Sequence, residues 1–134
     1  PLDELLAACR VISIHLPVTE ETHHLLGARE LALLQDGAVL VNTARAWVVD
    51  QDALLDELRR GRFWAALDVF DPEPLPPDHP LRSLDNVLLT PHVAGRTVES
   101  YAGLTATMVA EIAHFLRGEP LRHQVTHEML ATMA

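Results

Sequence analysis

His92 is the residue of this chain best placed for proton transfer. The apolar run 87–89 has the length of a buried parallel strand, and Thr90-Pro91 ends it because proline has no amide hydrogen to donate to a neighbouring strand. His92 therefore follows the carboxyl end of a strand, the edge at which open α/β sheets bind ligands. An imidazole at that edge can take up or release a proton near neutral pH. The ordinary alternative is a loop histidine without a task, so partners on the same edge decide between the two interpretations.

Three further polar side chains are expected at that edge. Arg45 follows the apolar run 38–42, Asp68 closes the run 64–70, and Glu73 lies just beyond it. Parallel strands all end at the same edge of a sheet, so a guanidinium, two carboxylates and an imidazole should lie near one another. Each has an ordinary explanation, as a surface cation, a strand-end cap or a solvated loop acid. Their coincidence on one edge favours a functional site.

The elements that must position these residues alternate along the chain. We expect strands at 11–16, 38–42, 64–70 and 87–89, and helices starting at Leu2, over 22–34, from the N-cap Asp50 through Leu58, and over 98–116. The proline-rich segment 72–80 is predicted to be an ordered surface loop. Continuous apolar strands alternating with helices predict an α/β fold with a parallel sheet of about four strands and flanking helices.

Composition narrows the class of protein. The chain has 134 residues, enough for one domain at most, and a formal net charge of −9, which argues against nucleic acid or an anionic membrane as a partner. A single cysteine, Cys9, can form no internal disulfide, and there is neither a membrane-spanning run nor a signal peptide, so we expect a cytoplasmic location. The start at Pro1 is interpreted as processing or as a piece of something longer.

Four motifs together resemble the carboxyl-terminal half of the D-isomer-specific 2-hydroxyacid dehydrogenases, the family that includes glyoxylate/hydroxypyruvate reductases and phosphoglycerate dehydrogenase. The motifs are His15-Leu16-Pro17 with Thr19 and Thr22, Val41-Asn42-Thr43-Ala44-Arg45, Leu67-Asp68-Val69-Phe70 with Glu73-Pro74, and Pro91-His92-Val93-Ala94-Gly95. They stand in the family's order and spacing over roughly residues 1–120. The resemblance implies the second half of a doubly wound, Rossmann-type sheet.

The resemblance also implies roles for the polar residues. Arg45 would hold the carboxylate and 2-oxo group of the substrate, and His92 would protonate the carbonyl oxygen as hydride arrives from the nicotinamide. Glu73 would orient the imidazole and favour its charged form. Formate dehydrogenases resemble this pattern but carry an amide at the position of Glu73. The implied activity is an NAD(P)-dependent oxidoreductase acting on a 2-hydroxy or 2-oxo acid.

A cofactor cleft for NAD or NADP is implied at the same edge. Its expected residues are Pro17, Thr43, Ala44, Arg45, Asp68, which would contact the nicotinamide carboxamide, His92 and Gly95. No metal ion is expected, because His23-His24 and the pair His123 and His127 lack a third ligand from a fixed neighbour. Trp47 and Trp64 are interpreted as packing residues rather than ligand platforms.

Two family features are absent from the sequence, the glycine-rich phosphate loop and the acidic residue that reads the ribose. We therefore expect weak or no cofactor binding by this chain alone, and no activity. Residues 1–118 would be a partial NAD(P)-binding Rossmann domain and 119–134 a tail, a remnant of the substrate domain. The unprotected edge of the strand at 11–16 predicts a homo-oligomer.

One departure from the family pattern concerns the arginine loop. The family usually has glycine after the arginine, and this chain has Ala46, which would strain the loop if the position needs a positive φ. Two other functions stay open on the sequence. One is a dehydrogenase-like dimerisation or corepressor module, and the other is an inactive truncated remnant.

Overall fold

The computed structural model describes all residues except 132 and 134. It divides into two compact units, Pro1–His92 and Val93–Met133, which are described separately. The predicted division after residue 118 stays a prediction.

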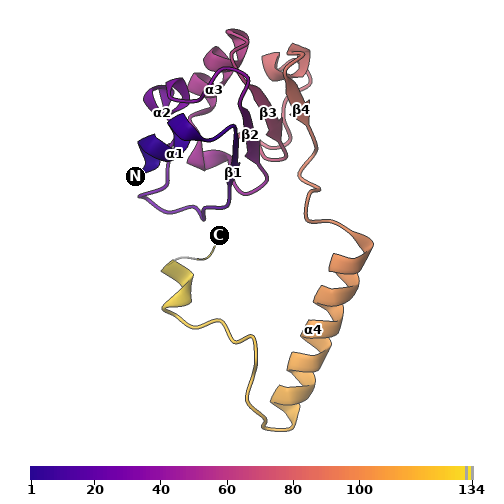
Figure 1. Ribbon diagram of the computed structural model, residues 1–134. Coiled ribbons are helices and arrows are strands. Elements are labelled where there is room, and N and C mark those ends of the chain that lie inside the picture. The colour runs from indigo at the N-terminus through magenta and orange to yellow at the C-terminus, as the bar shows by residue number, and fades with distance from the viewer. Residues whose placement is uncertain (132, 134) are drawn as a thin grey trace. The chain divides into compact units, whose positions relative to one another are not determined.

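The first unit is built on a four-stranded parallel sheet in the order β1-β2-β3-β4 (Figure 1). The strands are β1 (Val11–Ile14), β2 (Val39–Asn42), β3 (Trp64–Leu67) and β4 (Val87–Leu89). The α/β prediction with four parallel strands is confirmed. β1 and β3 end before residues 16 and 70, because the ladder with β2 stops where β2 itself ends, at Asn42.

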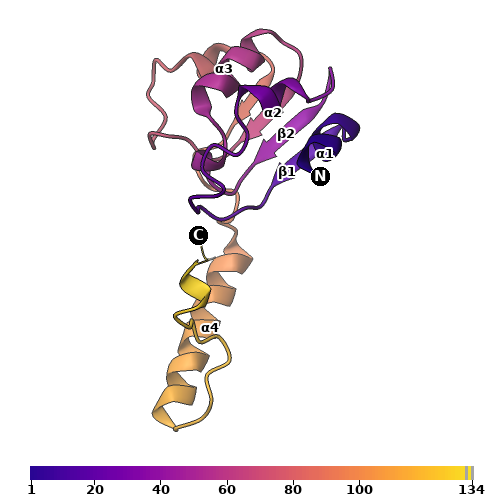
Figure 2. The ribbon, with the colours of Figure 1, turned by 90° about the vertical axis from the view of Figure 1, so that its left-hand side faces the viewer.

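Two helices cover one face of this sheet. Figure 2 shows α2 (Ala28–Ala32) and α3 (Gln51–Arg59) on the same side of the sheet. Alternate residues of the strands are buried in the core that these helices cover. The shared core takes in Ile12, Leu40 and Leu67 from the strands. α1 (Leu2–Ala8) is tied to α2 by an ion pair from Arg29 to Asp3 (2.7 Å). The opposite face leaves large apolar side chains exposed, at Val11, Trp64 and Leu88.

The helix predicted over 22–34 is wrong in its first half, because only α2 forms. Side-chain hydrogen bonds hold the preceding residues in turns: the Thr22 hydroxyl donates to the Pro17 carbonyl (2.7 Å), and the Thr19 amide donates to Thr22 Oγ1 (2.8 Å). Threonine side chains that bond nearby backbone compete with helix formation in this way. The prediction for α3 is confirmed, since the Asp50 carboxylate caps it by accepting from the Ala53 amide (3.0 Å).

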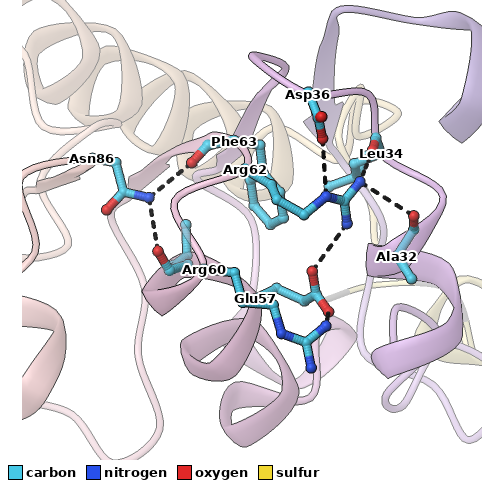
Figure 3. A network of polar contacts seen from close by, with 9 residues as sticks. Ala32, Leu34, Asp36, Glu57, Arg60, Arg62, Phe63 and Asn86 are labelled. Atoms are coloured by element: carbon cyan, nitrogen blue, oxygen red, sulfur yellow. Dashed lines mark hydrogen bonds and ion pairs between the residues drawn. The ribbon is translucent and has the colours of Figure 1, made fainter.

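A polar network ties the amino-terminal ends of the strands together (Figure 3). Arg62, just before β3, donates to Asp36 Oδ1 (2.9 Å), to the Leu34 carbonyl (2.6 Å) and to the buried carboxylate of Glu57 (3.1 Å). Glu57 also accepts from Arg60 (2.5 Å). In the same view Asn86, just before β4, donates to the carbonyls of Leu58 and Phe63. This edge is therefore structural, and it leaves the opposite edge free for a site.

The second unit contains α4 (Val98–Leu116) and a tail that ends in a short 3₁₀ helix, η3 (Met129–Ala131). Thr97 and Ser100 cap the start of α4 reciprocally. Gly118 follows the end of α4 with a φ of 69°, and the predicted helix over 98–116 is confirmed. No residue of α4 is buried within the structure. Among the described residues no helix is both long and apolar enough to cross a membrane.

Candidate active site

His92 is held at the carboxyl end of β4 by a tight reversal of the backbone. The Thr90 amide donates to the Leu67 carbonyl (3.0 Å), which extends the ladder one residue beyond the strand, and the His92 amide donates to the Thr90 carbonyl (3.0 Å). His92 adopts a φ of 55°, in the left-handed region that few residues other than glycine enter. His92 thus combines an uncommon backbone conformation with a position just beyond the carboxyl end of β4.

Glu73 fixes the orientation of that imidazole. Its Oε2 accepts from His92 Nδ1 (2.8 Å), and its Oε1 accepts from the amide of Phe70 (2.8 Å). Burial raises the pKa of Glu73, but the hydrogen bonds from His92 and the Phe70 amide outweigh it and hold the pKa below its usual value. The carboxylate therefore stays ionised, and it binds the ring at Nδ1 rather than at Nε2.

Arg45 is positioned by a buried amide at the end of β2. Asn42 is 1% exposed, and its side chain accepts from the Ala44 amide (3.1 Å) and donates to the Arg45 carbonyl (2.9 Å). The two bonds close the loop that carries the guanidinium. Ala46 brings no strain, because His24 and His92 are the only non-glycine residues with positive φ among those described.

An open cavity of about 460 Å³ brings the three predicted catalytic residues together. It is lined by Val18, Arg45, Ala46, Trp47, Val69, Phe70, Glu73 and His92. A fixed guanidinium and a carboxylate-bound imidazole on one apolar cavity can bind an anionic group and exchange a proton beside it.

Of the predicted cofactor residues, Arg45 and His92 line this cavity, whereas Pro17, Thr43, Ala44 and Asp68 are not among its lining residues. Asp68 is 2% exposed and accepts from the Thr90 hydroxyl at Oδ1 (2.5 Å). Pro17 and Ala44 are half-buried and Thr43 is exposed, all on loops that leave the carboxyl ends of β1 and β2. Gly95 belongs to the second unit.

The structure adds residues that the sequence analysis did not single out. Asn42 and Thr90 support the site. The available signal was a polar residue at the end of an apolar run, since Asn42 is the last residue of β2 and Thr90 directly follows β4. The interpretation of Trp47 and Trp64 as packing residues is wrong: they are 50% and 55% exposed. Trp47 lies on η1 (Ala46–Val48), a single turn at the sheet edge with its bulk outside the core. In the described part of the chain no three His, Cys, Asp or Glu side chains gather as metal ligands.

Residues 1–94 match the family model described as D-isomer specific 2-hydroxyacid dehydrogenase, NAD binding domain. The chain belongs to this family. Among its relatives, glyoxylate reductase from Thermofilum pendens is 43% identical over 132 residues, which is 96% of this chain and 38% of that protein. The chain thus spans about two fifths of the length of the curated relatives it matches.

Solved dehydrogenases of the family share the fold. The D-isomer specific 2-hydroxyacid dehydrogenase from Xanthobacter autotrophicus Py2, crystallised with NADPH and MES, has a TM-score of 0.79 and 42% identity, covering 93% of this chain and 51% of that one. D-mandelate dehydrogenase from Rhodotorula graminis has a TM-score of 0.86 and 33% identity, covering 94% and 37%. The Rossmann-type prediction is confirmed by these likenesses.

Proposed function

We propose that this chain carries the catalytic half of an NAD(P)-dependent 2-hydroxyacid dehydrogenase that interconverts a 2-oxo acid and its 2-hydroxy acid. The observation that supports the proposal is the shared cavity of Arg45 and the Glu73–His92 pair. A 2-oxo acid presents a carboxylate and a carbonyl oxygen on adjacent carbons. One cation and one proton donor side by side are the groups that such a molecule needs.

Each side chain has a separate task in this proposal. Arg45 binds the substrate carboxylate through its planar fork of N–H groups. His92 holds a proton at Nε2 and gives it to the carbonyl oxygen during reduction, and takes it back during oxidation. Glu73 binds Nδ1, so it keeps the ring in the orientation that aims Nε2 at the substrate.

The residues of this chain fit one end of the dinucleotide. The loops that leave the carboxyl ends of β2 and β3, with Thr43, Ala44 and Asp68 on them, would hold the nicotinamide. The bound cofactor supplies or accepts the hydride. The 134 residues contain no glycine-rich phosphate loop for the pyrophosphate, so we propose that this chain alone binds NAD(P) weakly or not at all.

The names of the relatives leave the substrate open, since they include glyoxylate reductase and D-mandelate dehydrogenase, whose substrates differ in the group beside the carbonyl. We therefore restrict the proposal to the class of 2-oxo and 2-hydroxy acids.

The test is NADH and NADPH oxidation by the complete gene product with a panel of 2-oxo acids, for the unchanged protein and for His92→Gln. We expect His92→Gln to lower kcat by about 10²- to 10⁴-fold while cofactor binding persists. The matched control is His114→Gln, because His114 also bonds a glutamate (Glu119, 2.6 Å) but lies on α4. Turnover that survives His92→Gln with a small loss would contradict the proton-donor role. Cofactor binding without turnover of any acid would favour the dimerisation or corepressor function instead.

A further inference from the structure

A second cavity adjoins the proposed active site. It is open, has a volume of about 480 Å³ and is lined by Val18, Thr19, Glu20, His23 and Trp47. Val18 and Trp47 also line the cavity of Arg45 and His92. The two cavities therefore adjoin each other at Val18 and Trp47. A ligand bound in the first cavity can extend past Trp47 into the second.

Trp47 is a rigid platform between the two cavities. Its carbonyl accepts from the His24 amide (2.8 Å), and the next residue, Val48, accepts from the Leu26 amide (3.0 Å). The His23 ring meets the indole at 76° with ring centres 5.2 Å apart, and it stacks on His24 at 4.0 Å. The indole is nonetheless half exposed. A large aromatic surface that is fixed before a ligand arrives loses little conformational entropy on binding.

The polar groups of the second cavity do not favour an anion. The Thr19 hydroxyl is already engaged with Thr22, accepting from its amide (3.2 Å) and pairing with its hydroxyl (3.1 Å). Glu20 adds a carboxylate, and neither lysine nor arginine is among the lining residues. A phosphate or a second carboxylate would meet like charge there, whereas an uncharged ring would meet Trp47, Val18 and the His23 ring.

We propose that the second cavity binds the aromatic side chain of the substrate, so that the preferred substrates are aryl-substituted monocarboxylic 2-oxo acids and their 2-hydroxy acids. The inference rests on the proposed function, because the carboxylate and oxo group must be held by Arg45 and His92. Trp47 is then a specificity-determining residue that contacts the substrate's side chain and not its reacting atoms.

Binding is tested first on this chain, without turnover. In a Trp64→Phe background the only indole is Trp47, so its emission reports the second cavity. We expect 3-phenyllactate to change this emission saturably, and lactate and malate to leave it unchanged at the same concentration. Equal responses to all three acids, or no response to 3-phenyllactate, would overturn the proposal.

Selectivity is tested next on the complete gene product. We expect Trp47→Leu to lower the ratio of kcat/KM for phenylpyruvate to kcat/KM for glyoxylate by about tenfold, whereas Trp47→Phe keeps the preference. Trp64→Leu is the matched control, since Trp64 is similarly exposed but sits at the amino-terminal end of β3. Equal losses for both acids together with a raised KM for NADH would overturn the proposal and assign the platform to the cofactor. If the protein turns over no acid, the proposed function fails and the emission measurement still decides the binding site.

Discussion

Thr90 and Asp68 are joined by a 2.5 Å hydrogen bond from the threonine hydroxyl to a buried carboxylate oxygen. The bond links the chain beyond β4 to the chain beyond β3, two residues before His92. Thr90 also bonds through its amide to Leu67 and through its carbonyl to His92. The hydroxyl, the amide and the carbonyl of Thr90 therefore all help to position the His92 imidazole.

Thr90→Val should destabilise the protein by about 1–3 kcal/mol, because valine has the shape of threonine but offers Asp68 no hydroxyl donor. Thr90→Ser keeps the hydroxyl and should lose less. Urea unfolding of the two variants provides the comparison. A serine variant less stable than the valine variant would show that the methyl group, and not the hydrogen bond, matters at this position.

Glu73→Gln should change how stability depends on pH. The pKa of Glu73 is lowered in the folded protein, so its ionised form stabilises the fold above the unfolded pKa of about 4.5, and this contribution is lost as pH falls through the folded pKa. The free energy of unfolding of the unchanged protein should therefore fall more steeply than that of Glu73→Gln below about pH 4.5. Parallel curves from pH 7 to 3 would contradict the assignment.

Asn42→Ala should weaken binding of the oxo acid, because the loop that carries Arg45 loses the two hydrogen bonds that the Asn42 side chain makes to it. We expect KM for the 2-oxo acid to rise about tenfold in the complete gene product. Asn86→Ala is a matched control, since Asn86 also bonds two backbone groups but at the opposite edge of the sheet. It should lower stability and leave KM unchanged. A similar rise in KM in both variants would indicate that the loss of stability, and not the loop of Arg45, causes the change.

Arg62→Leu should lower the free energy of unfolding by about 1–3 kcal/mol, as Glu57 is buried and would keep only Arg60 as a partner. The control is Arg59→Leu, which removes an exposed pair with Asp56 at 3.5 Å and should change stability by less than about 0.5 kcal/mol. Thermal and urea unfolding measure both. Equal small effects would mean that the network in Figure 3 adds little to stability.

The sequence by itself determined the order and direction of the elements. Continuous apolar strands, the N-cap Asp50 and the stop at Gly118 are local signals, and the α/β class, α3 and α4 followed from them with few errors at their ends. The edge on which Arg45, Glu73 and His92 should meet also followed, because parallel strands end together. The failure at 22–34 is local too, since threonine side chains took backbone partners that a helix needs.

Only the tertiary structure decided which residues touch. The bond of Glu73 to Nδ1 rather than to Nε2, the burial of Asp68 behind Thr90 and the exposure of Trp47 depend on how four loops pack against one another. Periodicity fixes the face on which a residue lies, but not its distance to a residue on another loop. Those distances depend on backbone conformations such as the left-handed turn at His92. Contacts with other loops, and not the local sequence, hold the chain in such conformations.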